Sequence, residues 1–510
     1  MKAFLMYPDR DFDMEQPLPS AAEALTQDLG LPIVLAAMAG GDAFLKEVAT
    51  KAILGSTDDV DTIRYRQAIL RDGLANPKVV RALYNLAGDA IQREKKGFWG
   101  GLSRHPGYML HRSVEVLEMF TEMLRKLRGV AERSTGDFES VGFKRFFTML
   151  ITELSDEYFG EIGDHLRRLR FRGGVLESAT LGRGLRGLEY CLRKPKDDQP
   201  GWFDWILGRG PASFTYRVHE RNEAGARALS ELRDRGINLV ANALARSTDH
   251  ILSFFTLMRT ELAFYVGCLN LADALAAKGQ PFCFPAPFPV GGRELSVEGL
   301  YDTALALSAD RKVIGNTANA DGKDIVVITG ANQGGKSTFL RSLGLAQLMM
   351  QCGMFVSASR YAAAASSGLF SHFKREEDAT MTSGKFDEEL DRMSRIADRI
   401  RPEGTILFNE SFAATNEREG SEIARQIVHA LVESRIRVAF VTHMYDFAHG
   451  FEEENRGNVL FLRAERSESG ERTFRMIEVL PLDTSYGEDL FRKTFGSEEL
   501  LTDDTKQVSI

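Results

Sequence analysis

The chain has 510 residues, of which 27% are charged and 44% are hydrophobic, an ordinary balance for a globular protein. This length suggests about three structural units. The net charge of -8 excludes a molecule that coats nucleic acid through its overall charge, so any contact with DNA must come from a local basic patch.

The beginning of the chain contains no recognisable targeting signal. The apolar run in MKAFLMYPDRDF is too short for a signal peptide, and residues 1–40 are interpreted as an N-terminal segment. The four cysteines are far apart and form no Cys-x-x-Cys pair: Cys191, Cys268, Cys283 and Cys352. That spacing argues against a zinc site and a disulfide framework and fits a reducing cytosol.

Residues 41–280 show a helical pattern, which predicts a long all-α core or lever domain. Apolar residues recur at three-to-four spacing, which is typical of a helix with one buried stripe. The first such stripe is Leu110, Val114, Leu117, Thr121 and Leu124. The second is Leu150, Leu154, Tyr158, Ile162, Leu166 and Leu169.

Basic residues gather between His165 and Lys196, where several glycines should also interrupt a helix. One interpretation is a loop or helix tip that contacts phosphates, which would place DNA contacts at Arg167, Arg168, Arg170 and Arg172. It would make residues 165–220 a clamp-like insertion. The other interpretation is a solvated face whose arginines pair with acidic helices nearby. The sequence leaves both open.

The most apolar long stretch, residues 251–277, carries Arg259, Glu261 and Asp273. A membrane-spanning helix rarely accepts such residues, so a buried helix is predicted. We therefore expect a soluble, cytoplasmic protein with no membrane partner.

Prolines at 281, 285, 287 and 289 mark a boundary, and residues 281–295 are predicted to be a linker. Beyond it, short β-branched runs at 324–329, 404–408 and 436–442 alternate with helical segments. That alternation predicts an α/β domain over residues 296–510, with a mostly parallel sheet covered by helices.

The segment GANQGGKS, from Gly330 to Ser337, fits the phosphate-binding pattern G-x-x-x-x-G-K-[ST]. An apolar strand precedes it and a helical pattern follows, which disfavours the alternative of a chance glycine-rich turn. Glycines let backbone N–H groups face phosphate oxygens at a helix N-terminus. Lys336 should then reach the β- and γ-phosphates of a nucleoside triphosphate, and Ser337 should hold magnesium.

Polar residues follow two later strands. Asn409 and Glu410 end the run GTILF, where ligands sit in parallel sheets, and Glu410 is the candidate for activating the attacking water. An aspartate is usual at position 409; the amide can orient a magnesium-bound water but supplies no charge. His443 ends the next strand and is a candidate to bond the γ-phosphate or the water. Both positions could instead be ordinary strand-end polar residues.

The sequence of residues 328–358 closely resembles the ATPase domain of MutS-type DNA mismatch repair proteins. The resemblance covers roughly residues 296–490 and continues through 383–390, 408–420, 441–448 and 484–487. It extends more weakly to residues 62–70 and 262–285, which are similar to the two ends of the family's helical core or lever domain. The resemblance implies an ABC-type P-loop ATPase joined to that lever, with a DNA-gripping clamp at the lever's far end.

The resemblance also implies roles for individual residues. The nucleotide-binding loop would comprise Gly330, Ala331, Asn332, Gln333, Gly334, Gly335, Lys336, Ser337 and Thr338. Lys336, Glu410 and His443 would be catalytic, while Ser337 and Asn409 would hold Mg²⁺, partly through water. Ser383 and Gly384 lie near the signature segment that meets the nucleotide of a second subunit, and Asn416 lies on a loop that links the two sites of a dimer.

Departures from the family pattern also carry expectations. The usual Ser-Thr-Phe signature reads Gly384-Lys385-Phe386, and Asn409 replaces an aspartate, so turnover is expected to be weaker. The chain starts almost directly with the lever, which predicts a short form that lacks the N-terminal mismatch-recognition domain. DNA binding without preference for a mismatch is expected for the same reason.

The sequence thus predicts a MutS-like ATPase that uses ATP and Mg²⁺ to clamp on duplex DNA, in repair or recombination. An ATP-promoted homodimer and repair partner proteins are expected. Two alternatives remain: an ABC-type ATPase that acts on protein or ribosome partners, and a non-hydrolysing, nucleotide-dependent scaffold.

Overall fold

The computed structural model describes residues 1–96, 106–171, 174–185, 187–193, 217–219, 221–375, 384–454, 456–467 and 472–482. Of the predicted site residues, Arg172 and Ser383 lie outside these ranges. The chain folds into two compact units that do not follow chain order. The first takes residues 1–3, 78–138 and 143–260; the second takes residues 4–77, 139–142 and the chain from 261 onward. The domain limits predicted at 40, 280 and 295 stay predictions.

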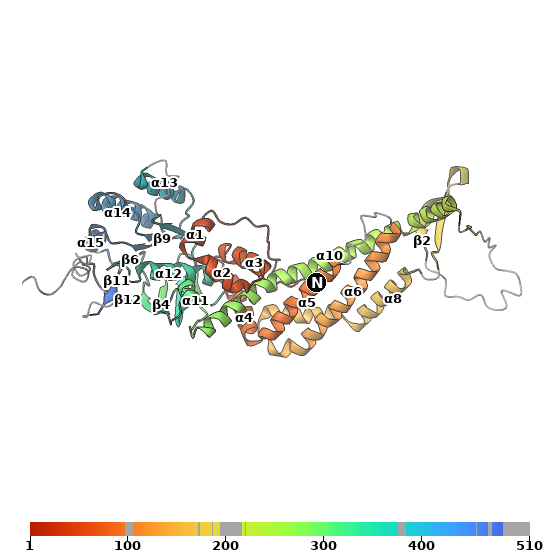
Figure 1. Ribbon diagram of the computed structural model, residues 1–510, viewed down its shortest axis with the longest axis horizontal. Helices are drawn as coiled ribbons and strands as arrows, with labels where there is room; N and C mark the ends of the chain where they lie inside the picture. Colours follow the sequence, from red (N-terminus) through yellow and green to blue (C-terminus); the bar gives the residue numbers. More distant parts are fainter. Residues whose placement is uncertain are drawn as a thin grey trace, which may run out of the picture. The chain divides into compact units, whose positions relative to one another are not determined.

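The first unit is mainly helical (Figure 1). Its helices are α5 (Pro77–Lys96), α6 (Pro106–Ser134), α7 (Val141–Glu153), α8 (Asp156–Leu169) and the N-terminal part of α10 (Glu223–Ala277), with a 3₁₀ turn η1 (Thr135–Asp137). The stripe predicted between Leu110 and Leu124 is confirmed on α6, where Leu110, Val114, Leu117 and Leu124 are buried.

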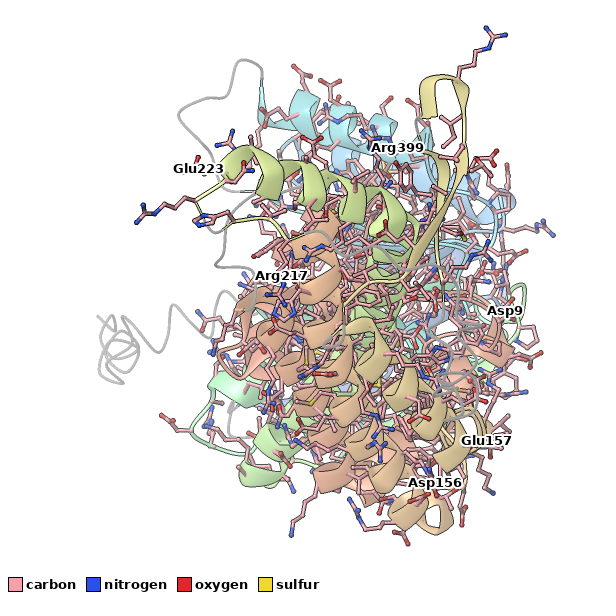
Figure 2. The ribbon with its side chains drawn as sticks, turned by 90° about the vertical axis from the view of Figure 1, so that its right-hand side faces the viewer. Asp9, Asp156, Glu157, Arg217, Glu223 and Arg399 are labelled. Carbon is pink, nitrogen blue, oxygen red and sulfur yellow. The ribbon has the colours of Figure 1, made fainter. Side chains whose placement is uncertain are left out.

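The second predicted stripe runs through two helices, because the chain breaks between α7 and α8. Ser155 Oγ accepts a 3.1 Å hydrogen bond from Tyr158 N and so caps α8. Asp156 and Glu157 fill the first turn, where carboxylates interact favourably with the positive end of the helix dipole (Figure 2). The cap sets the start of α8 despite the continuous apolar spacing.

Residues 177–192 form a β-hairpin, so the helical prediction for 41–280 is wrong in this part of the first unit. Strand β1 (Glu177–Leu181) pairs antiparallel with β2 (Gly187–Leu192), with a short 3₁₀ turn η2 (Arg183–Leu185) between them. Gly184 adopts φ +72°, a left-handed conformation that favours glycine. Gly184, one of the glycines that were expected to interrupt a helix, thus lies in the hairpin turn.

The second unit is built around a sheet with the described strand order β12–β11–β6–β10–β9–β8. The strands are β6 (Ile325–Thr329), β8 (Leu369–Phe373), β9 (Thr405–Asn409), β10 (Arg437–Val441), β11 (Val459–Arg466) and β12 (Arg472–Glu478). All pairings are parallel except that of β11 with β12. The strands predicted at 324–329, 404–408 and 436–442 are confirmed, as is the mostly parallel sheet.

Helices cover both faces of this sheet. On one face, α13 (Lys385–Ala397), α14 (Glu417–Glu433) and α15 (Tyr445–Glu454) pack on Ile325, Val327, Phe408 and Phe440 in one buried core. On the other face lies α12 (Lys336–Gln351), which follows β6. A Cβ at Gly344 of α12 would lie 2.6 Å from Leu407 Cδ1, so the glycine permits close helix–sheet packing there.

The proline-rich stretch 281–295 is part of a second sheet rather than a separate linker. Strand β3 (Ala286–Phe288) pairs parallel with β7 (Arg360–Ala364), and the described strand order is β3–β7–β4–β5. Strands β4 (Leu295–Leu300) and β5 (Asn316–Asn319) complete this sheet. The short helix α11 (Thr303–Ser308) lies between them in the chain. Pro287, the proline within β3, is tolerated because β3 is an edge strand.

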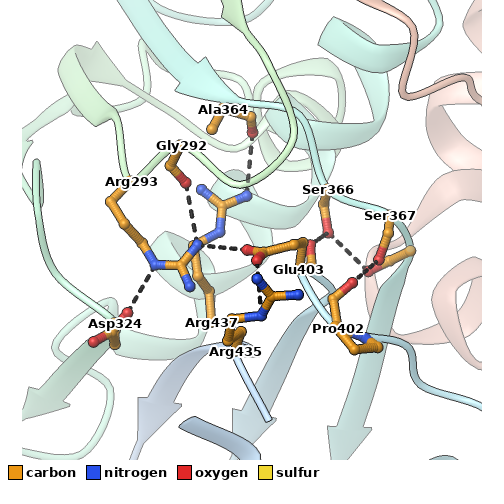
Figure 3. A network of polar contacts seen from close by, with 11 residues as sticks. Gly292, Arg293, Asp324, Ala364, Ser366, Ser367, Pro402, Glu403, Arg435 and Arg437 are labelled. Carbon is orange, nitrogen blue, oxygen red and sulfur yellow. Dashed lines mark hydrogen bonds and ion pairs between the residues drawn. The ribbon is translucent and has the colours of Figure 1, made fainter. Parts of the chain in front are cut away.

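A polar network fixes this stretch to the strand starts of the main sheet (Figure 3). Arg293 donates to Asp324 Oδ1 and Glu403 Oε2, both at 2.8 Å, and Arg435 Nε lies 3.3 Å from Glu403 Oε1. The buried Arg437 donates a 3.1 Å bond to Ala364 O at the end of β7. The network thus joins the two sheets of the unit.

The N-terminal residues of the second unit, with helices α1 (Ala22–Asp28), α2 (Leu31–Ala39), α3 (Ala43–Leu54) and α4 (Val60–Ala75), pack within the same body. A buried carboxylate anchors their leading segment: Glu261 accepts hydrogen bonds from Leu5 N at 2.6 Å and from Phe12 N at 3.2 Å. Tyr265 donates to Leu5 O at 2.5 Å. Burial raises the pKa of Glu261 to about 7.

Within the described residues, one helix, α10, is long enough and apolar enough to cross a membrane. The bent pair α1 and α2 also meets these criteria when the two helices are taken together. However, 67% of the apolar window of α10 is buried inside the protein. Core helices of globular proteins behave in this way, in agreement with the buried helix predicted for residues 251–277. The absence of a membrane partner stays a prediction.

The raised pKa of Glu261 predicts that the stability of the folded protein depends on pH. Because the folded state raises the pKa of Glu261, the protonated side chain stabilises the folded protein. This stabilisation is complete below the ordinary pKa of 4.5 and is lost as the pH rises to about 7. Relative to Glu261→Gln, the wild-type free energy of unfolding should therefore fall by about 3 kcal/mol between these pH values. Denaturant unfolding of both proteins at several pH values checks this. The exposed Glu15→Gln variant is the control, and a pH-independent difference for Glu261→Gln would contradict the prediction.

Candidate active site

The glycine-rich loop lies between the central strand β6 and α12, so the expected strand–loop–helix arrangement is confirmed. Gly330 and Gly335 adopt φ +110° and +94°, which favour glycine. A Cβ on Gly334 would lie 2.8 Å from Ala464 Cβ on β11. The neighbouring strand therefore fixes the path of the loop.

Lys336 is the first residue of α12, and its side chain is buried beneath the loop. Its ammonium donates hydrogen bonds to Gly330 O at 2.8 Å and Ala331 O at 3.1 Å. Burial lowers the pKa of Lys336, whereas the nearby Glu410 carboxylate raises it. The loop thus surrounds a desolvated ammonium group, which is suited to bind an anion strongly.

Ser337 and Asn409 come together across the sheet edge, although 72 positions separate them in the sequence. Ser337 Oγ donates a 2.7 Å hydrogen bond to Asn409 Oδ1, at the carboxyl end of β9. Two neutral oxygens at this point suit Mg²⁺, which prefers oxygen ligands and is commonly held by few protein groups. In the described part of the chain, no group of three or more His, Cys, Asp or Glu residues could hold a metal.

Glu410 lines two cavities, each of which also borders residues of the loop. Its backbone takes φ +54°, rare for a residue with a side chain, and its N–H donates to Val441 O at 2.9 Å. Its carboxylate thus lies between the loop side and the His443 side of the site. A residue that polarises a water next to a bound phosphate must have this access.

The larger cavity measures about 650 Å³ and reaches from the glycine loop to β12 and the residues before β5. Of the predicted residues, it is lined by Gln333, Gly335, Lys336, Ser337, Thr338 and Glu410. Its far wall is formed by Val313, Ile314, Asn316 and Phe474. The cavity has the volume and the mixed polar and apolar lining of small-molecule sites.

The smaller cavity, about 390 Å³, is lined by Gly330, Asn332, Glu410, His443 and Lys374, among others. The exposed His443 ring forms no hydrogen bond or ion pair with another described residue. Lys374 is placed beside Asn409 by a 2.9 Å bond from its N–H to Asn409 O. Glu410 and His443, predicted from separate strands, are thus brought to one cavity.

Other predicted residues lie elsewhere. Ala331 and Gly334 belong to the loop but line neither cavity, and Ala331 instead accepts from Lys336. Asn416 caps α14, because its Oδ1 accepts a 3.0 Å bond from Glu419 N. Gly384 precedes the first residue of α13. The roles of Gly384 and Asn416 toward a second subunit stay predictions.

Of the predicted DNA-contacting arginines, Arg167, Arg168 and Arg170 lie in and just after the last turn of α8, in the first unit. Arg167 forms an ion pair with Asp164, and Arg170 Nε donates to Glu118 Oε1 at 3.0 Å. The interpretation that arginines pair with acidic helices nearby therefore describes Arg170, whereas Arg167 pairs within α8. Arg168 is exposed and forms no ion pair with another described residue.

Several lining residues were missed because nothing near them in the sequence indicates a site. Asn316 accepts a 2.7 Å bond from Met476 N, and Arg472 donates a 2.7 Å bond to Gln333 Oε1 in the loop. Phe474 lies on β12, the strand that also carries Arg472 and Met476. Only Lys374, which follows a strand at the same sheet edge, could have been found by extending the strand-end argument.

Two family models match the chain: the MutS2 N-terminal domain over residues 58–278 and MutS domain V over residues 326–507. MutS protein homolog 4 of Homo sapiens is 24% identical over 303 residues, covering 58% of this chain and 31% of that protein. DNA mismatch repair protein MutS of Streptococcus agalactiae is 27% identical over 262 residues, covering 50% of this chain and 30% of that protein. DNA mismatch repair protein spellchecker 1 of Drosophila melanogaster is 27% identical over 194 residues, covering 38% of this chain and 21% of that protein. The alignments thus cover less than a third of each relative's length.

Proposed function

Since the chain belongs to the MutS-type DNA mismatch repair family, we propose that it is an ATPase that couples ATP binding and hydrolysis to clamping on duplex DNA. The observation that carries the proposal is the convergence of Lys336, Ser337 and Glu410 on one cavity, with Asn409 hydrogen-bonded to Ser337. ATPase activity also agrees with the match of residues 326–507 to MutS domain V, the ATPase domain of the family.

The cavity lining fits a magnesium nucleotide. Lys336 and the loop N–H groups would bind the phosphates, and the wall with Val313, Ile314 and Phe474 would accommodate a base. The oxygens of Ser337 and Asn409 would hold Mg²⁺, partly through water. When bound, this ion would neutralise phosphate charge during transfer.

The chain's own groups account for the remaining chemistry. Lys336 holds positive charge where negative charge develops on the phosphoryl group. Glu410 accepts a hydrogen bond from the attacking water and so orients and polarises it. His443 lines the small cavity together with Glu410 and would bond the γ-phosphate or that water. The enzyme class is therefore an ABC-type P-loop ATPase.

The dimer and the DNA contacts are further parts of the proposal. We place Ser383, Gly384 and Asn416 toward the nucleotide of a second subunit, so that ATP promotes a homodimer. Duplex DNA contacts the arginine-rich end of α8 through its phosphates. Repair proteins are the expected partners, and the cytoplasm is the expected location.

Phosphate release measured with and without duplex DNA, together with DNA binding at several salt concentrations, tests this function. We expect hydrolysis that DNA changes and a DNA affinity that falls steeply with salt. Hydrolysis without DNA binding would favour the ATPase that acts on protein or ribosome partners. Nucleotide binding without phosphate release would favour the non-hydrolysing scaffold.

Asn409→Asp should lower the Mg²⁺ concentration needed for half-maximal hydrolysis, because it places a carboxylate beside Ser337 Oγ, where the amide oxygen now lies 2.7 Å away. A magnesium titration of steady-state turnover checks this. Asn238→Asp, a substitution of the same kind at an exposed position of α10 that lines neither cavity, is the control. If both variants give the wild-type titration curve, Asn409 does not contribute to the metal site.

Replacing Arg167, Arg168, Arg170 and Arg172 with alanine should weaken binding to all duplexes alike and flatten its salt dependence. Glu118→Gln gives the opposite test, because it removes the carboxylate that pairs with Arg170 and should strengthen binding. Titrations of labelled duplex at two salt concentrations measure both effects. Unchanged binding in both variants would support the charged-face interpretation instead.

A further inference from the structure

We infer that Glu389, on α13, is a positioning residue that holds the Glu410 turn in its active geometry. This inference rests on the proposed ATPase function of Glu410. The Glu410 turn is defined here as residues 410–412, which connect the carboxyl end of β9 to the segment before α14. Glu389 lines neither cavity and lies outside the chemistry described above.

The Glu410 turn is conformationally costly. Glu410 and Phe412 have φ +54° and +64°, the left-handed region that residues with side chains seldom adopt. This conformation is unfavourable for residues with side chains, so the turn persists only when surrounding contacts impose it. Without these contacts the Glu410 carboxylate would lose its place between the two cavities.

Each residue of the turn is held by a different element. Glu410 N–H donates to Val441 O on β10 at 2.9 Å. Ser411 Oγ donates to His372 O on β8 at 2.5 Å. Phe412 N–H donates to Glu389 Oε2 on α13 at 2.7 Å. The first two bonds come from the sheet on which the turn sits, and only the third reaches a helix.

The contact with Glu389 is buried and well supported. Glu389 is 3% exposed, and its Oε1 has no hydrogen-bond partner among the described residues. The His372 ring stacks on Phe412 with centroids 5.3 Å apart, and its Nδ1 lies 2.7 Å from Ser411 Oγ. Arg392, one turn further along α13, donates to Phe373 O at 2.9 Å. A carboxylate is kept in this interior because it binds the Phe412 amide.

The arrangement fixes α13 to the turn. Glu389 lies in the second turn of the helix, whose first residue is Lys385. A displacement of α13 would therefore pull on Phe412 N–H and shift Glu410, two residues away. Whatever contacts the start of α13 would in this way influence water activation in the same subunit.

The test compares Glu389→Met with Glu389→Gln. Methionine matches the length of the side chain but has no oxygen to accept the Phe412 amide, whereas the glutamine amide oxygen can still accept it. We expect kcat for ATP hydrolysis to fall at least about tenfold in the Met variant and at most about threefold in the Gln variant. The Kd for ATP should stay unchanged in both. Asp391→Asn, an exposed change on the same helix, should keep the wild-type kcat.

Hydrogen exchange gives a readout that is independent of activity. The Phe412 amide should be protected in wild type and in Glu389→Gln and should exchange faster in Glu389→Met. A Phe412 amide that exchanges freely in wild type would overturn the inference, and that measurement stands even if the Met variant fails to fold. Equal loss of kcat in the Met and Gln variants, or wild-type kcat in the Met variant, would also overturn it. Absent hydrolysis in wild type would instead refute the proposed function and leave the exchange result to decide the role of Glu389.

Discussion

Replacing Lys336 with alanine should lower the affinity for ATP by more than about tenfold, which corresponds to about 1.4 kcal/mol. The ammonium is desolvated beneath the loop and is the cation nearest to where the β- and γ-phosphates would bind. The substitution also removes the hydrogen-bond donor to Gly330 O and Ala331 O, which helps to hold the loop. Calorimetry with ATP measures the loss.

Two further variants show whether the loss of ATP affinity comes from the missing ammonium group or from a change in folding. Lys336→Met keeps most of the buried side-chain volume but removes the charge and the hydrogen-bond donor, so it should lose ATP affinity to a similar degree. Lys46→Ala, an exposed change on α3, should bind ATP as the wild type does. If Lys336→Ala retains full affinity, residues 330–337 are not a phosphate-binding loop.

Changing Glu410 to glutamine should leave ATP binding intact and slow hydrolysis by about a hundredfold, within the range for a positioned general base. The amide keeps the size of the side chain but is a far weaker acceptor for the proton of the attacking water. Single-turnover hydrolysis measures this step directly. Because ATP then persists, the variant should accumulate as a dimer, which light scattering with ATP detects.

The control for this experiment is Glu433→Gln, an exposed substitution at the end of α14 that should hydrolyse ATP at the wild-type rate. Wild-type turnover in Glu410→Gln would show that another group activates the water. A strict monomer at micromolar concentration, with ATP bound, would argue against completion of the site by a second subunit.

The sequence by itself determined the parts of this protein that depend on neighbouring residues. The glycine-rich loop, the strand before it and the helix after it are contiguous, and glycines, β-branched residues and apolar spacing each favour their local conformation. The strand ends carrying Glu410 and His443 were predictable for a related reason, since parallel strands present their carboxyl ends at one edge of the sheet.

Only the tertiary structure decided the features that rest on distant contacts. Residues 281–295 have the local signals of a linker, yet β3 pairs with β7, more than seventy positions away. The far wall of the large cavity joins Asn316 to a strand 160 residues later, and Glu389 meets Phe412 across 23 residues. Arg170 likewise acquires a carboxylate partner in Glu118, 52 positions earlier. Local conformational preference carries no information about such pairings, because they form only when separate elements pack around a shared core.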